Sequence, residues 1–151
     1  MPRRANTVGQ CATVVPVSAS GPDEGYLTTV FNGASLPLSF IDSGSNGMYF
    51  NDSSIAPCTQ AGFMTFYCPS SADSLSAAFE LASGSTVSEN FVVVSAETVT
   101  ASVTAFPGLA GTNPSSPQSF DWGLPFFYGR SVFVVTENET VGGKTGPYVA
   151  F

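Results

Sequence analysis

The residues best suited to chemistry lie in one stretch, 40–50, in which Asp42 follows an apolar strand and opens a glycine-rich turn. The turn reads Asp-Ser-Gly-Ser-Asn-Gly over residues 42–47, and a second apolar run follows at 48–50. A carboxylate at the end of a buried strand costs free energy unless it is paired or hydrogen-bonded. Such a group is typically catalytic, a metal ligand, or a turn former bonded to its own backbone.

The residue types that are missing narrow the chemistry to carboxylates. The chain has no histidine, which excludes Ser-His-Asp and Cys-His catalysis and every histidine-containing zinc site. Its three cysteines, Cys11, Cys58 and Cys68, are too few for an all-cysteine zinc site. Calcium is disfavoured because a calcium loop starting at Asp42 needs Glu at its twelfth position, where Ser53 stands. We therefore predict neither a metal nor a cofactor.

Composition indicates a folded domain that is mostly β. Charged residues make up 10% and hydrophobic residues 43% of the chain, which excludes a disordered tail. The 13 phenylalanines, with many Val, Thr and Ser, favour strands. A net charge of −7 argues against nucleic acid or an anionic membrane as a partner.

Hydrophobic alternation and turn signals predict many short strands. Residues 1–20 are expected to be an extended segment with an edge strand at 14–17, and residues 21–151 a single β domain. Strands at 26–31 and 36–42 form a predicted hairpin, because Asn32-Gly33 lies between them. Further strands are predicted at 75–81, 91–94, 99–105, 130–136 and 148–151, a short helix at 125–128, and loops at 51–74 and 107–119.

The cysteines favour a disulfide. Cys58 and Cys68 flank a loop whose closure is expected to contribute a few kcal/mol, and we prefer a bridge to two buried thiols. Cys11 is then free, or pairs with a segment outside this chain.

Nothing in the sequence resembles a membrane span or a signal peptide, because no apolar run is long enough and residues 1–4 lead into polar residues. The chain is then either cytosolic or a piece of a longer protein, and we favour the second. We expect an extracytoplasmic protein, either periplasmic, secreted, or anchored to the surface through a missing N-terminal segment.

The stretch Phe40-Ile41-Asp42-Ser43-Gly44-Ser45 resembles the active-site loop of the pepsin-like aspartic proteases, where two apolar residues precede Asp-Thr/Ser-Gly-Ser/Thr. The resemblance implies that Asp42 holds the attacking water and that the Ser43 hydroxyl joins a hydrogen-bonded scaffold between paired loops. It also implies that Gly44 lets backbone N–H groups approach the carboxylate, with Ser45 completing the motif.

A second stretch has the order of features that follows this loop in pepsin-like lobes. Trp122-Gly123 precedes a short apolar helix at 124–128 and the residues Ser131-Val132-Phe133. The resemblance covers residues 25–151 and implies that the strand carrying Gly123 passes under the Asp42 loop, so that Trp122 and Gly123 support the site. The implied fold is one pepsin-like lobe, a partly open acid-protease barrel.

More closely, the chain is similar to the C-terminal half of the bacterial DUF3443 family, over residues 40–47 and 120–133. Members of that family carry another Asp-Thr-Gly-Ser-type loop in an N-terminal half, whereas this chain has one such loop. The resemblance therefore implies that a second catalytic carboxylate comes from a missing N-terminal lobe or from a homodimer partner.

Asp121 departs from the pepsin-like pattern, which has an apolar residue there. It is a candidate second carboxylate within the same lobe. An exposed aspartate at the start of a strand is expected instead, because Asp is seldom fully buried.

Together these features predict one lobe of an aspartic-type endopeptidase. Its substrate would be an extended peptide or protein, and Asp42 would activate water together with an aspartate from another lobe or protomer. A non-catalytic secreted β domain with a binding or structural role is the alternative, since a fold does not determine a function.

Overall fold

Short strands make up most of the computed structural model, which describes residues 13–19, 21, 24–99 and 106–151. Seven strands form one sheet in the order β6-β5-β2-β3-β8-β4-β7, and three form a second sheet in the order β1-β12-β9. The predicted mostly β class is confirmed. The elements are β1 (Val14–Pro16), β2 (Leu27–Phe31), β3 (Ala34–Ile41), β4 (Met48–Tyr49), β5 (Asp73–Glu80), β6 (Thr86–Val93), the 3-10 helix η2 (Ala96–Thr98), β7 (Ala110–Gly111), β8 (Asp121–Trp122), the 3-10 helix η3 (Leu124–Phe127), β9 (Phe133–Val135), β10 (Thr140–Val141), β11 (Lys144–Thr145) and β12 (Tyr148–Ala150).

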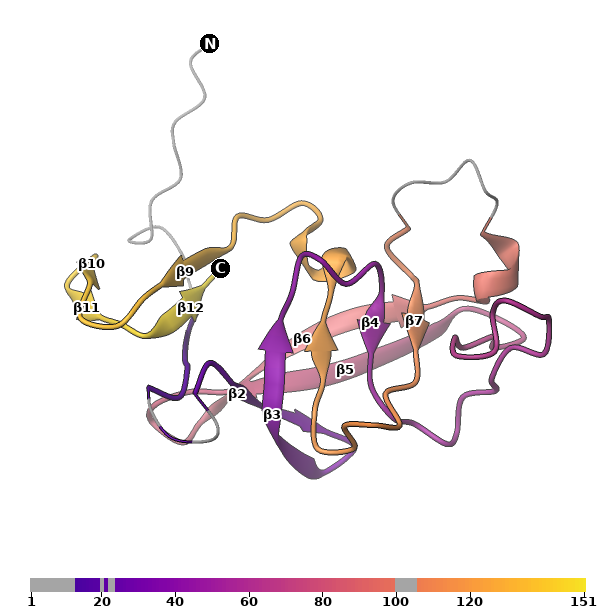
Figure 1. The fold of residues 1–151 in the computed structure, drawn as a ribbon, viewed down its shortest axis with the longest axis horizontal. Helices are drawn as coiled ribbons and strands as arrows, with labels where there is room; N and C mark the ends of the chain where they lie inside the picture. Colours follow the sequence, from indigo (N-terminus) through magenta and orange to yellow (C-terminus); the bar gives the residue numbers. More distant parts are fainter. Residues whose placement is uncertain (1–12, 20, 22–23, 100–105) are drawn as a thin grey trace, which may run out of the picture.

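The seven-stranded sheet curls into a nearly closed barrel. In Figure 1, β3 and the orange strand β8 run upward, β4 and β7 run downward beside them, and β5 and β6 cross behind. Next to the end of β6, the Val94 N–H donates to the carbonyl of Gly108 over 3.0 Å, so the first and last strands of the sheet approach each other here. A glycine is needed at this contact, because a β-carbon on Gly108 would lie 2.9 Å from the Val94 side chain.

The hairpin that leads to the site forms as predicted. β2 and β3 pair antiparallel with Phe31 opposite Ala34, so Asn32 and Gly33 are the two turn residues. Both have positive φ, 49° and 77°, which matches the tight two-residue turns of β-hairpins. The turn thereby sets the register of the strand that ends at Ile41, directly before Asp42.

Aromatic side chains fill the space inside the barrel. Trp122 is fully buried, and its ring centroid lies 4.4 Å from that of Phe120 and 4.5 Å from that of Phe79. The indole Nε1–H donates to Thr29 Oγ1 over 2.9 Å, so the one polar group of the ring is satisfied. The strand bearing Trp122 is therefore fixed in the centre of the core.

The second sheet closes one side of the core. β1 lies at its edge, with Pro16 opposite Tyr148, which confirms the predicted edge strand at 14–17. Phe151, which follows β12, contacts Phe79 and Phe126 with ring centroids 5.1 Å and 4.9 Å apart.

Two predictions about local structure are corrected. Residues 107–119 are not wholly a surface loop, because Ala110 and Gly111 form the buried strand β7 beside β4. The glycine permits close packing, since a β-carbon on Gly111 would lie 2.5 Å from the Thr65 carbonyl oxygen. The predicted helix at 125–128 is the 3-10 helix η3 and begins one residue earlier, at Leu124. Most of the strand predicted at 99–105 lies outside the described residues, as does Cys11.

Candidate functional site

Parallel pairing of β3 with β8 positions the candidate site. Phe40 lies opposite Asp121 and Ile41 opposite Trp122. The Asp42 N–H donates to the Trp122 carbonyl over 3.1 Å, which extends the pairing to the first residue of the loop. Asp42 is thereby held where β3 ends, although it lies about 80 residues before its neighbour along the chain.

The Asp42 carboxylate is held by its own loop. Its Oδ1 accepts a hydrogen bond from the Gly44 N–H over 2.7 Å, and its Oδ2 lies 3.2 Å from Ser45 Oγ. A β-carbon on Gly44 would lie 3.0 Å from that Oδ1, so a larger residue would crowd the carboxylate. Asp42 is half-buried while Ser43 and Gly44 are exposed, so the carboxylate is both oriented and near solvent.

The loop rests on Gly123. The Leu124 N–H donates to the Ser45 carbonyl over 2.7 Å. A β-carbon on Gly123 would lie 1.9 Å from the Gly47 carbonyl oxygen, a distance that no side chain could occupy. The structure therefore brings Asp42, Ser45 and Gly123 together, and the loop between β3 and β4 lies beside η3 at the upper end of the strands in Figure 1.

Asp121 is buried, which corrects the expectation of an exposed residue at the start of a strand. Asp121 is 5% exposed because its strand, β8, lies between β3 and β4. The next residue, Trp122, points to the opposite side of the strand and into the aromatic core. The Oδ2 of Asp121 lies 2.5 Å from Ser45 Oγ, and its Oδ1 has no hydrogen-bond partner among the described residues.

The surroundings of Asp121 disfavour its ionised form. Burial raises the pKa of Asp121, the hydrogen bond with Ser45 opposes that rise, and the charge of Asp42 adds to it, giving a value of about 6. Two carboxyl groups thus meet at one serine hydroxyl, and they differ in exposure and in the number of donors around them.

Tyr49 is a site residue that the sequence reasoning missed. It lies opposite Asp121 across β4 and β8, and its hydroxyl donates to Asn46 Oδ1 within the same loop. Burial raises the pKa of the Tyr49 hydroxyl, and the charge of Asp121 adds to the rise. In the sequence, only the three-residue spacing between Asn46 and Tyr49 points to their hydrogen bond. That spacing is informative only once the conformation of the turn is known.

A comparison with family models matches residues 2–151 of the chain to DUF3443, described as a protein of unknown function. The chain belongs to the DUF3443 family. Searches of curated proteins and of solved structures found no match. The resemblance to DUF3443 is thus confirmed, whereas the likeness of this DUF3443 chain to pepsin-like proteases receives no support from these comparisons.

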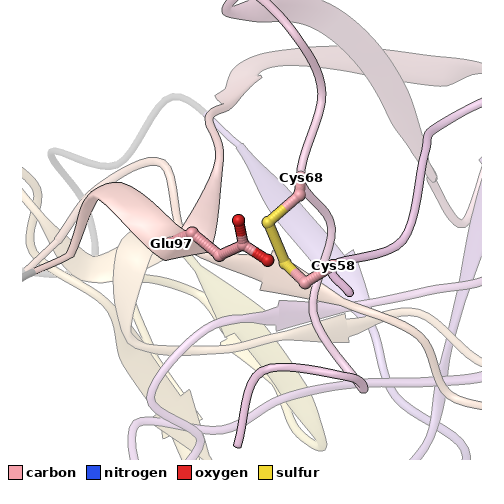
Figure 2. Close-up of side chains that lie close together, drawn as sticks. All are labelled: Cys58, Cys68 and Glu97. Atoms are coloured by element: carbon pink, nitrogen blue, oxygen red, sulfur yellow. A yellow bond between two sulfur atoms is a disulfide. The ribbon is translucent and has the colours of Figure 1, made fainter. Parts of the chain in front are cut away.

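A second cluster in the DUF3443 chain consists of Cys58, Cys68 and Glu97, shown in Figure 2. The two sulfurs are bonded to each other and the Cα atoms lie 4.7 Å apart, which confirms the predicted bridge. Glu97 Oε1 accepts from the N–H groups of Thr59 and Gln60 over 3.1 and 2.9 Å. A disulfide offers no thiolate to a metal ion. We therefore interpret this cluster as one that holds the 58–68 loop in place rather than as a metal site.

The bridge is compatible with an extracytoplasmic location for this DUF3443 chain, because disulfides persist in oxidising compartments. No helix among the described residues is long and apolar enough to cross a membrane.

Proposed function

We propose that this DUF3443 chain is one half of an aspartic-type hydrolase that cleaves extended peptides, with Asp42 holding the attacking water. The observation that carries the proposal is the support of the Asp42 carboxylate by the Gly44 N–H at 2.7 Å and the Ser45 hydroxyl at 3.2 Å. Donors on both oxygens fix the orientation of the carboxylate, which as a general base must face the water whose proton it accepts.

Hydrolysis of an amide needs a base and an acid together. The Asp42 carboxylate removes a proton from water while the water oxygen bonds to the peptide carbonyl carbon. A second, protonated carboxyl group gives its proton to the carbonyl oxygen. When the tetrahedral intermediate collapses, Asp42 gives its proton to the amide nitrogen, the C–N bond breaks, and the second carboxylate takes a proton from one hydroxyl group of the intermediate, which leaves a carboxylic acid and an amine. Two carboxylates that face one water share a single proton over an acidic range, so they supply both roles.

The second carboxylate that faces the substrate comes from an N-terminal lobe or from a second copy of the chain. The exposure of Ser43 and Gly44 supports this, because the tip of the Asp42 loop is accessible to another loop. In this arrangement the Ser43 hydroxyl would bond to the partner loop, and the water would lie between the two aspartates.

A mainly apolar cavity of about 470 Å³ begins next to the loop, at Met48, and is lined further along by Phe126 and Arg130, whereas none of residues 42–47 lines it. In the proposed function this cavity would take a large apolar side chain of the peptide at a distance from the cleaved bond. An apolar side chain buried there would contribute on the order of 1–3 kcal/mol to binding.

The test is peptide hydrolysis from pH 3 to pH 8 with a library of extended peptides, for this chain and for the natural full-length protein, each beside its Asp42→Asn variant. We expect acid-favoured cleavage by the full-length protein that is lost in the variant. Absence of cleavage by the full-length protein at every pH would contradict the proposal and favour a binding or structural domain.

A further inference from the structure

Ser45 links the two carboxyl groups through a hydroxyl that has only one proton. Its Oγ lies 3.2 Å from Asp42 Oδ2 and 2.5 Å from Asp121 Oδ2, and both distances are within hydrogen-bond range. A serine hydroxyl donates one hydrogen bond and accepts others. It can therefore donate to only one of the two carboxyl groups at a time, and the other contact is a hydrogen bond only if that carboxyl group is protonated and donates to the Ser45 oxygen.

We propose that Asp121, Ser45 and Asp42 form a hydrogen-bonded chain holding one extra proton, in which protonated Asp121 donates to Ser45 and Ser45 donates to ionised Asp42. Asp121 is then a positioning residue that acts on Asp42 through Ser45. The shared proton is independent of hydrolysis, while its importance for catalysis rests on the proposed function.

The surroundings of the two aspartates decide which one holds the proton. Asp42 is half-buried and already accepts the Gly44 N–H, so its negative charge is partly compensated. Asp121 is 5% exposed, and its Oδ1 is buried without a donor in the described part of the chain. An unpaired neutral carbonyl oxygen is far less costly to bury than an unpaired charge, so the proton belongs on Asp121 Oδ2, facing Ser45.

The ionisable groups that face Asp121 strengthen this assignment. They are Asp42, from the loop after β3, and Tyr49, from β4. Both are acidic, so ionising Asp121 would bring a second negative charge beside Asp42. The rise in the pKa of Asp121 to about 6 is in the same direction.

The arrangement has a consequence for the base. While Asp121 keeps its proton, the Ser45 hydroxyl is directed at Asp42 and donates a hydrogen bond to its Oδ2. Once Asp121 loses its proton, both carboxylates compete for the single Ser45 proton, and Asp42 loses part of its support. The hydrogen bond from Ser45 to the water-activating Asp42 carboxylate is thus retained in the acidic range. Above that range this hydrogen bond is weakened.

The test is a carboxyl-carbon NMR titration of the folded protein, wild type and variants, which needs no substrate. We expect the Asp121 carboxyl to titrate about two pH units above an ordinary aspartate, and this resonance to be identified by its loss in Asp121→Asn. Asp42→Asn should lower that midpoint, because a neighbouring charge is removed. Asp52→Asn, which changes an aspartate in another turn, should leave it unchanged.

Variants at position 121 separate the hydrogen-bonded chain from packing alone. Asp121→Asn keeps a neutral donor toward Ser45, so the carboxyl-carbon chemical shift of Asp42 at acidic pH should stay near its wild-type value. Asp121→Leu and Ser45→Ala remove the hydrogen-bonded chain, and both should change that chemical shift. If the variants fold poorly, the wild-type titration still decides. A wild-type Asp121 midpoint near 4, or one that Asp42→Asn does not move, would overturn the proposal. Because this readout is independent of cleavage, a shared proton without hydrolysis would contradict only the proposed function.

Discussion

Gly123 lies against the Gly47 carbonyl so closely that a β-carbon on Gly123 would be 1.9 Å from that oxygen. Its φ of −71° is open to any residue, so the need for glycine here is steric rather than conformational. We expect Gly123→Ala to destabilise the fold by roughly 1–3 kcal/mol or more, because either the loop or β8 must move. Denaturant unfolding measures the change, and the Gly44 and Ser45 amide resonances report the displacement of the loop.

Gly84→Ala is the matched control for that variant. Gly84 has a φ of 78° and no atom within 4 Å of an added β-carbon, so its substitution costs conformational strain of about 1 kcal/mol without touching the site. Equal costs for the two variants, with unchanged loop resonances in both, would show that the loop does not rest on Gly123.

Burial of Asp121 predicts how stability depends on pH. Its pKa of about 6 in the folded chain exceeds the ordinary value of 3.8, so the folded state keeps a proton that the unfolded state loses between these values. The free energy of unfolding should therefore fall as the pH rises from about 4 to about 6, by up to about 3 kcal/mol, and stay lower above that range.

Asp121→Asn cannot titrate and should lack this part of the pH dependence. Urea unfolding of both proteins at pH 4, 5, 6 and 7 tests the prediction. If the two curves stay parallel through this range, Asp121 titrates alike in the folded and unfolded chains, and the account of its burial is wrong.

The bridge between Cys58 and Cys68 predicts the count of free thiols. In denaturant without reductant the chain should show one reactive thiol, from Cys11, and three after reduction. Closing a loop of 10 residues is expected to stabilise the fold by about 2–3 kcal/mol, so the double variant Cys58→Ala/Cys68→Ala should unfold at a correspondingly lower urea concentration. Three thiols before reduction would rule the bridge out.

The hydrogen bond between Trp122 and Thr29 anchors the strand that carries Asp121. Thr29→Val keeps the shape of the side chain but leaves the buried indole N–H without its acceptor, and we expect a loss of about 1–3 kcal/mol. Thr29→Ser retains the hydroxyl and loses only a methyl group, so its cost should be smaller. Equal losses in the two variants, measured by thermal unfolding, would assign the effect to packing.

Local signals in the sequence are sufficient to predict the β2–β3 hairpin and the order of the elements around the Asp42 loop. Asn32-Gly33 favours one type of turn through its own conformational preferences, and the glycine pair at 142–143 likewise joins β10 to β11. Gly123 next to Trp122 was expected to lie under the Asp42 loop, and the contacts of Gly123 with the carbonyl oxygens of Ser45 and Gly47 agree with that expectation.

The burial of Asp121 could not be read from its neighbours in the chain. β8 is two residues long, and its position between β3 and β4 is set by pairing with residues about 80 positions away. The same holds for β7, whose Ala110-Gly111 has no strand pattern of its own and is recognised only by the contacts of Gly111. Tyr49 became a site residue through its place opposite Asp121.

The proposed activation of water by the Asp42 carboxylate is tested most directly by kcat/KM for a cleaved peptide in the full-length protein carrying Asp42→Asn or Asp52→Asn. The two aspartates are matched, because Asp52 Oδ1 accepts the N–H of Ser54 over 2.9 Å, two residues on, as Asp42 accepts that of Gly44. We expect kcat/KM to fall by roughly 100-fold or more for Asp42→Asn and to change little for Asp52→Asn. Activity that survives Asp42→Asn, or falls equally in both variants, would contradict the proposal.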